Sequence, residues 1–310
     1  MKAITISIDK RLIILVLLFV IYLYYFSNKN KNASFFDIRE KIHFDTFEVY
    51  KFNEIRQKLS QIKCSQMWAN QKEFLNGIIR KFKPEKIVEL GVYNGGSSII
   101  ILNAIDDFKK SKLYSIDLNS ENFIGHCVGK YYPKFLRNWK LFKGNIATEY
   151  IEKIGNNIDI AMIDTAHFEP GEILDFLVIL PFLKEEAIVI FHDIGNQITI
   201  SKSRNEWAPY IIFNGIRGKK YYPSGKYILK QDIGAIKLEK NQKKYYHDYF
   251  RLLGGQWQYF PKEIHIKQFA NFFKKYYDEE CLIMFEEAVI FNRNFVKNNP
   301  KNILYKVNSD

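Results

Sequence analysis

Acidic and imidazole side chains stand together at two places in the sequence. Asp164 and His167 follow one apolar run, and His192 and Asp193 close another. An imidazole with a pKa of about 6.5 can take a proton from a reacting hydroxyl, and a neighbouring carboxylate can assist it. These residues therefore predict a general base, with His192 slightly preferred over His167 because it lies on the run itself, and Asp164 beside it.

A glycine-rich turn follows the first apolar run, at Glu89–Ser98. Gly91 and Gly95 permit a sharp turn and a close approach of the backbone to a ligand, and either serine could cap the helix that follows. Asp117 stands twenty-two residues beyond Gly95, where a carboxylate would accept both hydroxyls of a ribose. The spacing Gly-x-x-x-Gly-Gly departs from the dinucleotide pattern Gly-x-Gly-x-x-Gly. The turn and the acid together predict a nucleoside site; alternatively, the glycines only form a loop.

Taken together, these residues resemble the class I S-adenosylmethionine-dependent methyltransferases. The first motif of that family, an acid followed by Gly-x-x-x-Gly, is matched by Glu89, Gly91 and Gly95, and its second acid by Asp117. The resemblance implies that the turn from Glu89 to Gly96 holds the methionine part of S-adenosylmethionine and that Asp117 holds the ribose. Asn145, where the family more often has Asp, would contact the adenine.

The two acid–histidine pairs resemble the sugar and small-molecule O-methyltransferases of the macrocin and catechol types, with Asp-x-x-His after one strand and His-Asp after the next. In metal-dependent relatives the carboxylates at these places bind a divalent ion, so the resemblance implies a Mg²⁺ site at Asp164 and Asp193. It also implies a hydroxyl-bearing acceptor, a sugar or glycan. Alternatively, Asp164 caps the next helix, and His192 and Asp193 hydrogen-bond to loop backbone.

Short apolar runs alternate with helical stretches through the middle of the chain, a pattern that predicts a parallel sheet with crossover helices. The runs are Lys86–Val92, Lys112–Leu118, Trp139–Lys143, Ile158–Asp164 and Ala187–Ile194. Two further runs, Lys226–Leu229 and Ile233–Leu238, predict a closing hairpin. The expected fold is α/β: a Rossmann-like, mostly parallel seven-stranded sheet flanked by helices, with an N-terminal membrane anchor and a helical C-terminal extension.

The pattern predicts four parts along the chain. They are a membrane anchor at 1–29, a helical lead-in at 30–83, an S-adenosylmethionine-binding domain at 84–240, and a basic helical extension at 241–310.

The anchor is predicted from Leu12–Phe26, fifteen apolar residues without a charge. As a helix this run covers about 22 Å, against a hydrocarbon core of about 30 Å, so it spans only with help from its flanking Lys and Tyr residues. A cleaved signal peptide is the alternative, but the small-x-small cleavage pattern is missing. Positive charges on both sides leave the orientation open; we expect a single-pass anchor with the catalytic domain in the cytoplasm.

The net charge of +12 suggests nucleic acid at first, yet its distribution argues against that partner. Residues 196–310 hold 20 basic and 11 acidic residues, so +9 of the charge belongs to the region after the last central strand. There Lys-Lys-Tyr-Tyr occurs three times, which indicates either solvated helix faces or contacts with anionic groups. The three cysteines show no metal-binding spacing and exclude a disulfide-rich secreted scaffold.

Three functions remain open from the sequence. The first is methyl transfer from S-adenosylmethionine to a hydroxyl by a membrane-anchored enzyme. The second is an enzyme of the same fold that binds NAD or a nucleotide-sugar. The third is a membrane-tethered, non-catalytic binding protein that uses the Lys-Lys-Tyr-Tyr segments.

Overall fold

The structure is a computed structural model that describes residues 39–41, 57–195, 207–223 and 232–298. The chain forms two compact units, residues 1–39 and 40–310. Only Arg39 is described in the first, so the account below concerns the second. No helix among the described residues is long and apolar enough to cross a membrane, and the predicted anchor lies outside them.

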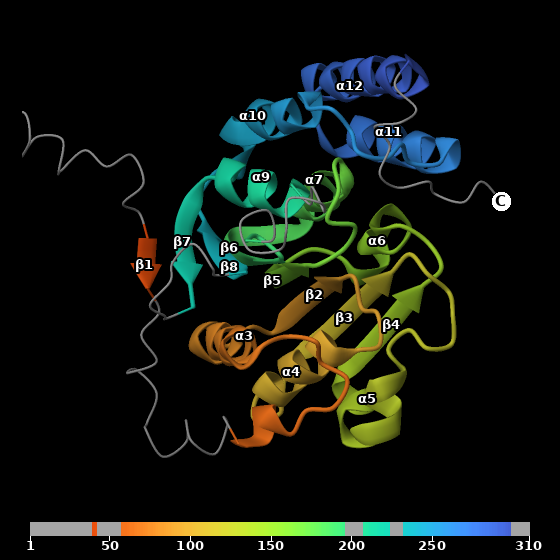
Figure 1. Ribbon diagram of the computed structural model, residues 1–310. Helices are drawn as coiled ribbons and strands as arrows, with labels where there is room; N and C mark the ends of the chain where they lie inside the picture. Colours follow the sequence, from red (N-terminus) through yellow and green to blue (C-terminus); the bar gives the residue numbers. More distant parts are fainter. Residues whose placement is uncertain (1–38, 42–56, 196–206, 224–231, 299–310) are drawn as a thin grey trace, which may run out of the picture. The chain divides into compact units, whose positions relative to one another are not determined.

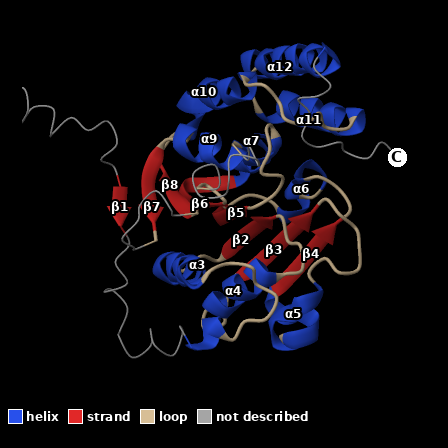
Figure 2. Cartoon of the chain, in the orientation of Figure 1, coloured by secondary structure: helices blue, strands red, loops and turns tan. Residues whose placement is uncertain are grey.

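Helices and strands alternate through most of the second unit, and helices alone follow the last strand of its described part, as Figures 1 and 2 show. The strands are β1 (Arg39–Lys41), β2 (Lys86–Leu90), β3 (Lys112–Asp117), β4 (Trp139–Lys143), β5 (Ile158–Ile163), β6 (Leu183–His192), β7 (Gly218–Tyr222) and β8 (Ile233–Leu238). The α-helices are α3 (Ala69–Phe82), α4 (Gly96–Ile105), α5 (His126–Tyr131), α6 (Ile151–Ile154), α7 (Gly171–Ile179), α9 (Ala208–Gly215), α10 (Tyr246–Arg251), α11 (Glu263–Tyr276) and α12 (Glu279–Asn298).

The strands form one mixed sheet in the order β1-β7-β8-β6-β5-β2-β3-β4. Strands β2 to β6 are parallel, whereas β8 pairs antiparallel with both β6 and β7. The order of the five parallel strands reverses between β2 and β5, the switch point at whose carboxyl edge open α/β sheets bind ligands. The expected Rossmann-like arrangement of seven strands is therefore present, with β8 running against its neighbours and three-residue β1 recorded beyond β7.

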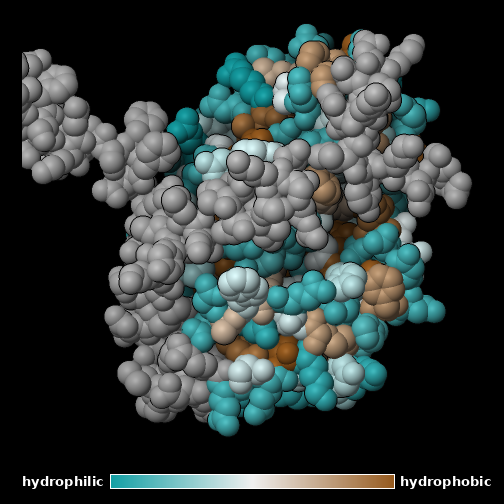
Figure 3. Space-filling model, viewed as in Figure 1, coloured by the Kyte–Doolittle hydropathy of each residue, from teal (hydrophilic) through white to brown (hydrophobic). Residues whose placement is uncertain are grey.

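Side chains of the central strands alternate between two separate cores, as the period of two in a strand requires. In β5, Ile160 and Met162 join the core under α3, α4 and α5, while Ala161 and Ile163 join the core under α6, α7 and the C-terminal helices. Both faces are covered, and for this reason the central strands are continuously apolar. On the face drawn in Figure 3, hydrophobic residues of the described part appear as scattered patches among hydrophilic ones.

The predicted strands 86–92, 112–118, 139–143, 158–164 and 187–194 are confirmed within a few residues. One arm of the predicted hairpin, Ile233–Leu238, is confirmed as β8, whose antiparallel neighbours are β6 and Gly218–Tyr222. The run Lys226–Leu229 lies outside the described residues. In β7, Tyr221 and Tyr222 are buried, which is why a Lys-Lys-Tyr-Tyr sequence can serve as a strand.

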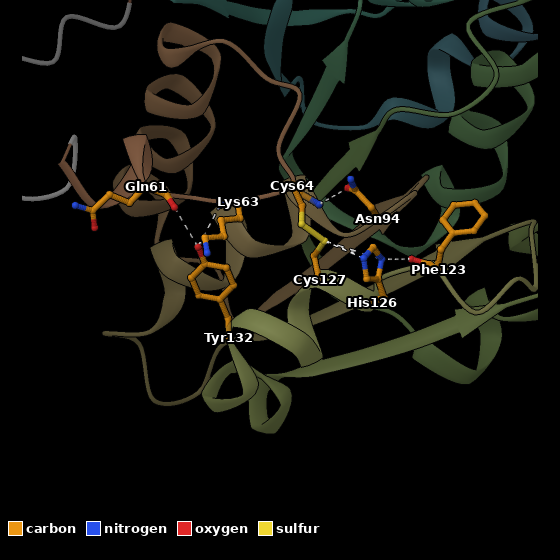
Figure 4. The surroundings of a disulfide bond; sticks show 9 residues. Gln61, Lys63, Cys64, Asn94, Phe123, His126, Cys127 and Tyr132 are labelled. Carbon is orange, nitrogen blue, oxygen red and sulfur yellow. Dashed lines mark hydrogen bonds between the residues drawn. A yellow bond between two sulfur atoms is a disulfide. The ribbon is translucent and has the colours of Figure 1, made fainter.

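One disulfide was not predicted. Cys64, in the segment before α3, is bonded to Cys127 in α5, sixty-three residues later. The bond holds that segment against the start of α4, where a Cβ on Gly96 would lie 2.7 Å from the carbonyl oxygen of Cys64. Figure 4 shows the bond beside Asn94, whose carbonyl accepts the N–H of Cys127. A single bridge is compatible with excluding a disulfide-rich scaffold.

Candidate active site

The glycine turn after β2 is shaped by the neighbouring strand end. Gly91 and Gly95 have φ angles of +85° and +94°, in the region that favours glycine. A Cβ on Gly91 would lie 1.8 Å from the carbonyl oxygen of Asp164, so no other residue fits there. Asp164 in turn donates its N–H to the carbonyl of Leu90. The turn and the first residue of the acid–histidine cluster are thus in backbone contact.

Glu89 is fully buried on β2, and its side chain hydrogen-bonds to residues at the start of the helix that follows the turn. Its two carboxylate oxygens accept hydrogen bonds from Ser97, Ser98 and Ser115, at 2.5 to 2.6 Å. Burial raises the pKa of Glu89 to about 7, although the three hydroxyls act in the opposite direction. The expectation that a serine side chain caps α4 is wrong, because both hydroxyls are directed to Glu89 and Asn94 Oδ1 accepts the N–H of Gly96.

Asp117 ends β3 and faces the same turn. Its Oδ2 accepts the N–H groups of Val92 and Tyr93 at 2.9 and 3.0 Å, and its Oδ1 accepts the N–H of Asn119. A carboxylate offers about four lone-pair positions, so Oδ1 can still accept a ligand hydroxyl. Leu118, the next residue, is 52% exposed, which leaves an apolar side chain open at the predicted ribose position.

Asn145 follows β4 and meets a residue far along the chain. Its Oδ1 accepts the N–H of Ile146 at 2.8 Å and lies 3.5 Å from Nε2 of Gln268, which is on α11. Two side-chain oxygens here, Oγ1 of Thr148 and Oε1 of Gln268, are buried and have no hydrogen-bond partner in the described structure.

The acid–histidine cluster forms beside the glycine turn, where β5 and β6 end. Nδ1 of His192 lies 3.6 Å from Oδ2 of Asp164 and 3.3 Å from Oδ2 of Asp193. Nδ1 of His167 lies 3.3 Å from the same oxygen of Asp193, and its Nε2 lies 3.9 Å from Oδ1 of Asp164. The structure therefore brings together the four residues predicted for base catalysis and metal binding. The alternative that Asp164 caps a helix is not supported, since α7 begins after Pro170 without a side-chain cap.

Neighbouring charges set the ionisation of this cluster. Burial lowers the pKa of His192, but the carboxylates of Asp164 and Asp193 outweigh it and raise the pKa well above its usual value. Burial opposes ionisation of Asp193, yet contact with His192 and His167 keeps its pKa below the usual range. Asp232 has a raised pKa because it is buried next to Asp193.

Asp232 was missed by the sequence reasoning. It directly precedes β8, whose start pairs with the end of β6, and its Oδ1 accepts the N–H of Gly195. Two sets of three side chains here have possible metal-ligand atoms within 4.8 Å of one another. One set is Asp164, His167 and Asp193, and the other is His192, Asp193 and Asp232.

Glu172 was also missed. It is fully buried at the start of α7, and its Oε1 accepts the N–H of His167 at 2.6 Å and lies 3.5 Å from Nδ1 of that ring. Burial is the main cause that raises its pKa to about 7. Glu172 therefore fixes the backbone and the ring of His167 from below.

A third group with metal-ligand atoms, His247, Asp278 and Cys281, lies in the C-terminal helices. Asp278 accepts the N–H of Cys281 and so satisfies the start of α12. Burial raises the pKa of the Cys281 thiol to about 12. This group serves helix capping.

Residues 88–194 match the family model described as a methyltransferase domain. The match covers about a third of the chain and includes the glycine turn, Asp117 and the acid–histidine cluster. It supports an S-adenosylmethionine-dependent methyltransferase over the segment that carries these residues. A comparison with curated proteins finds no match.

Several solved methyltransferase structures are similar at low sequence identity. An O-methyltransferase from Streptomyces achromogenes, in complex with S-adenosylmethionine, is 16% identical with a TM-score of 0.43, over 61% of this chain and 89% of that one. An O-methyltransferase from Bacillus cereus is 14% identical with a TM-score of 0.42, over 60% and 90%. A methyltransferase from Podospora anserina is 14% identical with a TM-score of 0.44, over 77% and 100%.

Proposed function

We propose that this protein is an S-adenosylmethionine-dependent methyltransferase that acts on a hydroxyl group of a sugar or glycan. One observation carries the proposal: the glycine turn and the acid–histidine cluster are in backbone contact at Gly91 and Asp164. A nucleoside held by the turn and Asp117 would have its reactive end beside two histidines and three carboxylates.

The chain's own residues fit the cofactor in three places. The turn from Gly91 to Gly96 lies at the start of α4, and Asp117 retains an acceptor position for a ribose hydroxyl. Near Asn145, two buried side-chain oxygens have no hydrogen-bond partner in the part of the chain that the structure describes. When bound, S-adenosylmethionine supplies an electrophilic methyl group on a sulfonium. The work left to the protein is to hold an acceptor oxygen in line with that methyl and to remove its proton.

His167 and His192 are the candidates for proton removal. The side chain of His167 is 27% exposed and that of His192 is 14% exposed, so His167 is the more open to an incoming acceptor. Glu172 orients His167, and Asp164 and Asp193 orient His192. The carboxylates that raise the pKa of His192 favour its protonated form, which must lose its proton before it can act as a base. The choice of His192 as the base therefore stays a prediction alongside His167.

The cluster also fits a divalent cation. Carboxylate oxygens and imidazole nitrogens lie close together around Asp193. Both ring nitrogens of His192 are buried and have no hydrogen-bond partner of satisfactory geometry among the described residues. Asp164 and Asp193 would hold the ion with His167, and His192 and Asp232 form a second group of possible ligands around Asp193. A bound divalent ion would lower the pKa of an acceptor hydroxyl. Imidazole donors suit Mn²⁺, Fe²⁺ or Zn²⁺ better than Mg²⁺, so the metal is part of the test.

The aromatic side chains that follow Gly195 differ in their exposure to an incoming acceptor. Tyr221 and Tyr222 are 4% and 7% exposed and belong to the two cores. Trp207 and Tyr210 are exposed, and their rings lie 6.5 Å apart in an edge-on arrangement. These two remain the candidates for stacking on a sugar ring.

Calorimetric binding of S-adenosylhomocysteine and NAD to the full-length protein tests the cofactor. We expect the Asp117→Ala variant to lose at least tenfold in affinity for S-adenosylhomocysteine, because a charge-assisted hydrogen bond is removed. Asp107→Ala, at an exposed position after α4, serves as the matched control. Tighter binding of NAD than of S-adenosylhomocysteine would favour the second function instead.

Transfer of labelled methyl groups to glycan fractions tests the reaction. Label should appear in a hydroxyl-bearing product and fall on treatment with EDTA, and re-addition of Mg²⁺ or Mn²⁺ should show which ion restores it. Cofactor binding without label in any fraction would favour a non-catalytic binding protein.

A further inference from the structure

The C-terminal helix α11 reaches the predicted adenine position through one side chain. Gln268 lies 123 residues beyond Asn145, yet its Nε2 is 3.5 Å from Asn145 Oδ1. Helix α11 packs on the short helix at Ala147–Glu149 that follows β4, and Thr148 belongs to that short helix. Polar side chains from two distant parts of the chain therefore converge directly after β4.

Two side chains of this group, Gln268 and Thr148, each have a buried oxygen without a hydrogen-bond partner among the described residues. The two atoms are Oε1 of Gln268 and Oγ1 of Thr148. Most buried polar groups in folded proteins do have partners, and each exception calls for a reason such as a missing ligand. Near Asn145, a buried acceptor and a buried hydroxyl therefore keep hydrogen-bonding capacity that no described residue uses.

Helix α11 is held firmly enough to present Gln268 in one position. Phe269, Phe272 and Phe273 on the same helix are 0 to 5% exposed in the core beneath it. At its C-terminal end, Lys275 and Tyr276 both donate hydrogen bonds to Glu152 of α6, at 2.8 and 2.9 Å. The packing of α11 therefore holds Gln268 in a fixed position next to Asn145.

We propose that Gln268 recognises the adenine base of the cofactor, with Thr148 beside it. The inference rests on the proposed function and adds a specificity residue from outside the segment that matches the methyltransferase family. Adenine presents an amino group next to a ring-nitrogen acceptor, and a carboxamide presents the complementary acceptor and donor, the pairing by which Gln and Asn read adenine in nucleic acids. Oε1 of Gln268 accepts the amino N–H, and the Thr148 hydroxyl adapts to a ring nitrogen.

The test compares two ligands that differ only in the base: S-adenosylhomocysteine and S-inosylhomocysteine, in which an oxygen replaces the amino group. The full-length protein should bind the adenosine ligand about tenfold or more tightly, since the inosine oxygen faces an acceptor. Gln268→Leu should lose most of this preference. Gln268→Glu keeps an acceptor in place and should keep the preference, and Lys267→Ala, exposed on the same helix, is the control.

The outcomes separate this inference from the proposed function. If the unmodified protein binds neither ligand, the proposed function fails. If it prefers the adenosine ligand and Gln268→Leu prefers it equally, the base is recognised elsewhere and the role of Gln268 is overturned. Circular dichroism melting of each variant shows whether a lost preference reflects unfolding, in which case affinity for both ligands would fall together.

Discussion

Glu89 is an acid whose buried position makes protein stability depend on pH. Burial raises its pKa from 4.5 to about 7, so the folded state binds a proton more tightly than the unfolded state does. The resulting stabilisation is complete below about pH 4.5 and is lost as the pH rises through about 7. With 1.36 kcal/mol for each pKa unit, the loss is at most about 3 kcal/mol.

Glu89→Gln should remove this dependence, because glutamine resembles the protonated acid and can still meet Ser97, Ser98 and Ser115. Urea unfolding of both proteins from pH 5 to 8 should show the unmodified protein losing stability relative to the variant up to about pH 7, and no further change above it. Taking the difference cancels the contributions of Glu169 and Glu172, whose pKa values burial also raises to about 7. Parallel curves for the two proteins would mean that Glu89 is ionised throughout.

Predictability at the residue scale depends on distance along the chain. The turn residues, Asp117 and the pairs at 164–167 and 192–193 follow predicted strands, so strand order alone placed them at one edge. Asp232 precedes a strand, and it reaches that edge only because β8 is antiparallel, which its sequence does not reveal. Gln268 depends on how a helix packs, and no local pattern carries that information.

At the scale of elements, the disulfide joins the segment before α3 to α5 across the start of α4. Closing a loop of sixty-three residues removes conformational freedom from the unfolded chain, worth about 4 kcal/mol in the chain-entropy model. The same region supports the cofactor turn, since Gly125 and Cys127 donate their N–H groups to Tyr93 and Asn94. The cytoplasmic location expected from the sequence stays a prediction.

Cys64→Ser and Cys127→Ser should each lower the free energy of unfolding by about 2–4 kcal/mol and weaken S-adenosylhomocysteine binding, because the turn loses lateral support. Reductant should destabilise the unmodified protein to the level of these variants and leave the variants themselves unchanged. Cys281→Ser, at the free buried cysteine, is the control that should keep its sensitivity to reductant. Two titratable thiols at 64 and 127 in the oxidised protein would contradict the bond.

The strands that could be predicted from the sequence are those whose residues are buried on both faces of the sheet. Strands β2, β5 and β6 are covered on both faces, so their continuous apolar runs predict them directly. Strand β7 was missed because Gly218–Tyr222 is half polar and lies toward the edge of the sheet, where Lys219 faces solvent while Tyr221 and Tyr222 enter the cores. In an amphipathic strand of only five residues, the alternation of polar and apolar side chains is too short to be told apart from a helical surface pattern.

At the scale of the whole molecule, the basic region after the last parallel strand is structurally part of the fold. Lys243, Lys244, Lys274 and Lys275 are exposed, whereas the tyrosines that follow them are buried or half-buried. The Lys-Lys-Tyr-Tyr segments therefore expose charge while their rings pack inward. This arrangement supports the interpretation of these segments as solvated helix faces. It weakens the third function, a binding protein that uses the Lys-Lys-Tyr-Tyr segments.

The extension predicted at 241–310 shares one core with the sheet, so a chain that ends at residue 240 should fail to fold. Tyr249 stacks edge-on against Phe176 at 5.4 Å, Phe272 lies 6.2 Å from Phe182, and Trp257 is 2% exposed in the same core. Burying each large side chain contributes about 1.5–3 kcal/mol, and a typical domain is stable by about 5–15 kcal/mol, so the loss of several such side chains would exceed the stability of the fold.

The truncated chain should be insoluble or bind hydrophobic dyes, and co-expression of residues 241–310 as a separate chain should restore a folded, S-adenosylhomocysteine-binding complex. A truncated protein that unfolds cooperatively and binds the ligand as well as the full chain would instead make the extension an independent domain, and would exclude any part for Gln268 in recognising the base.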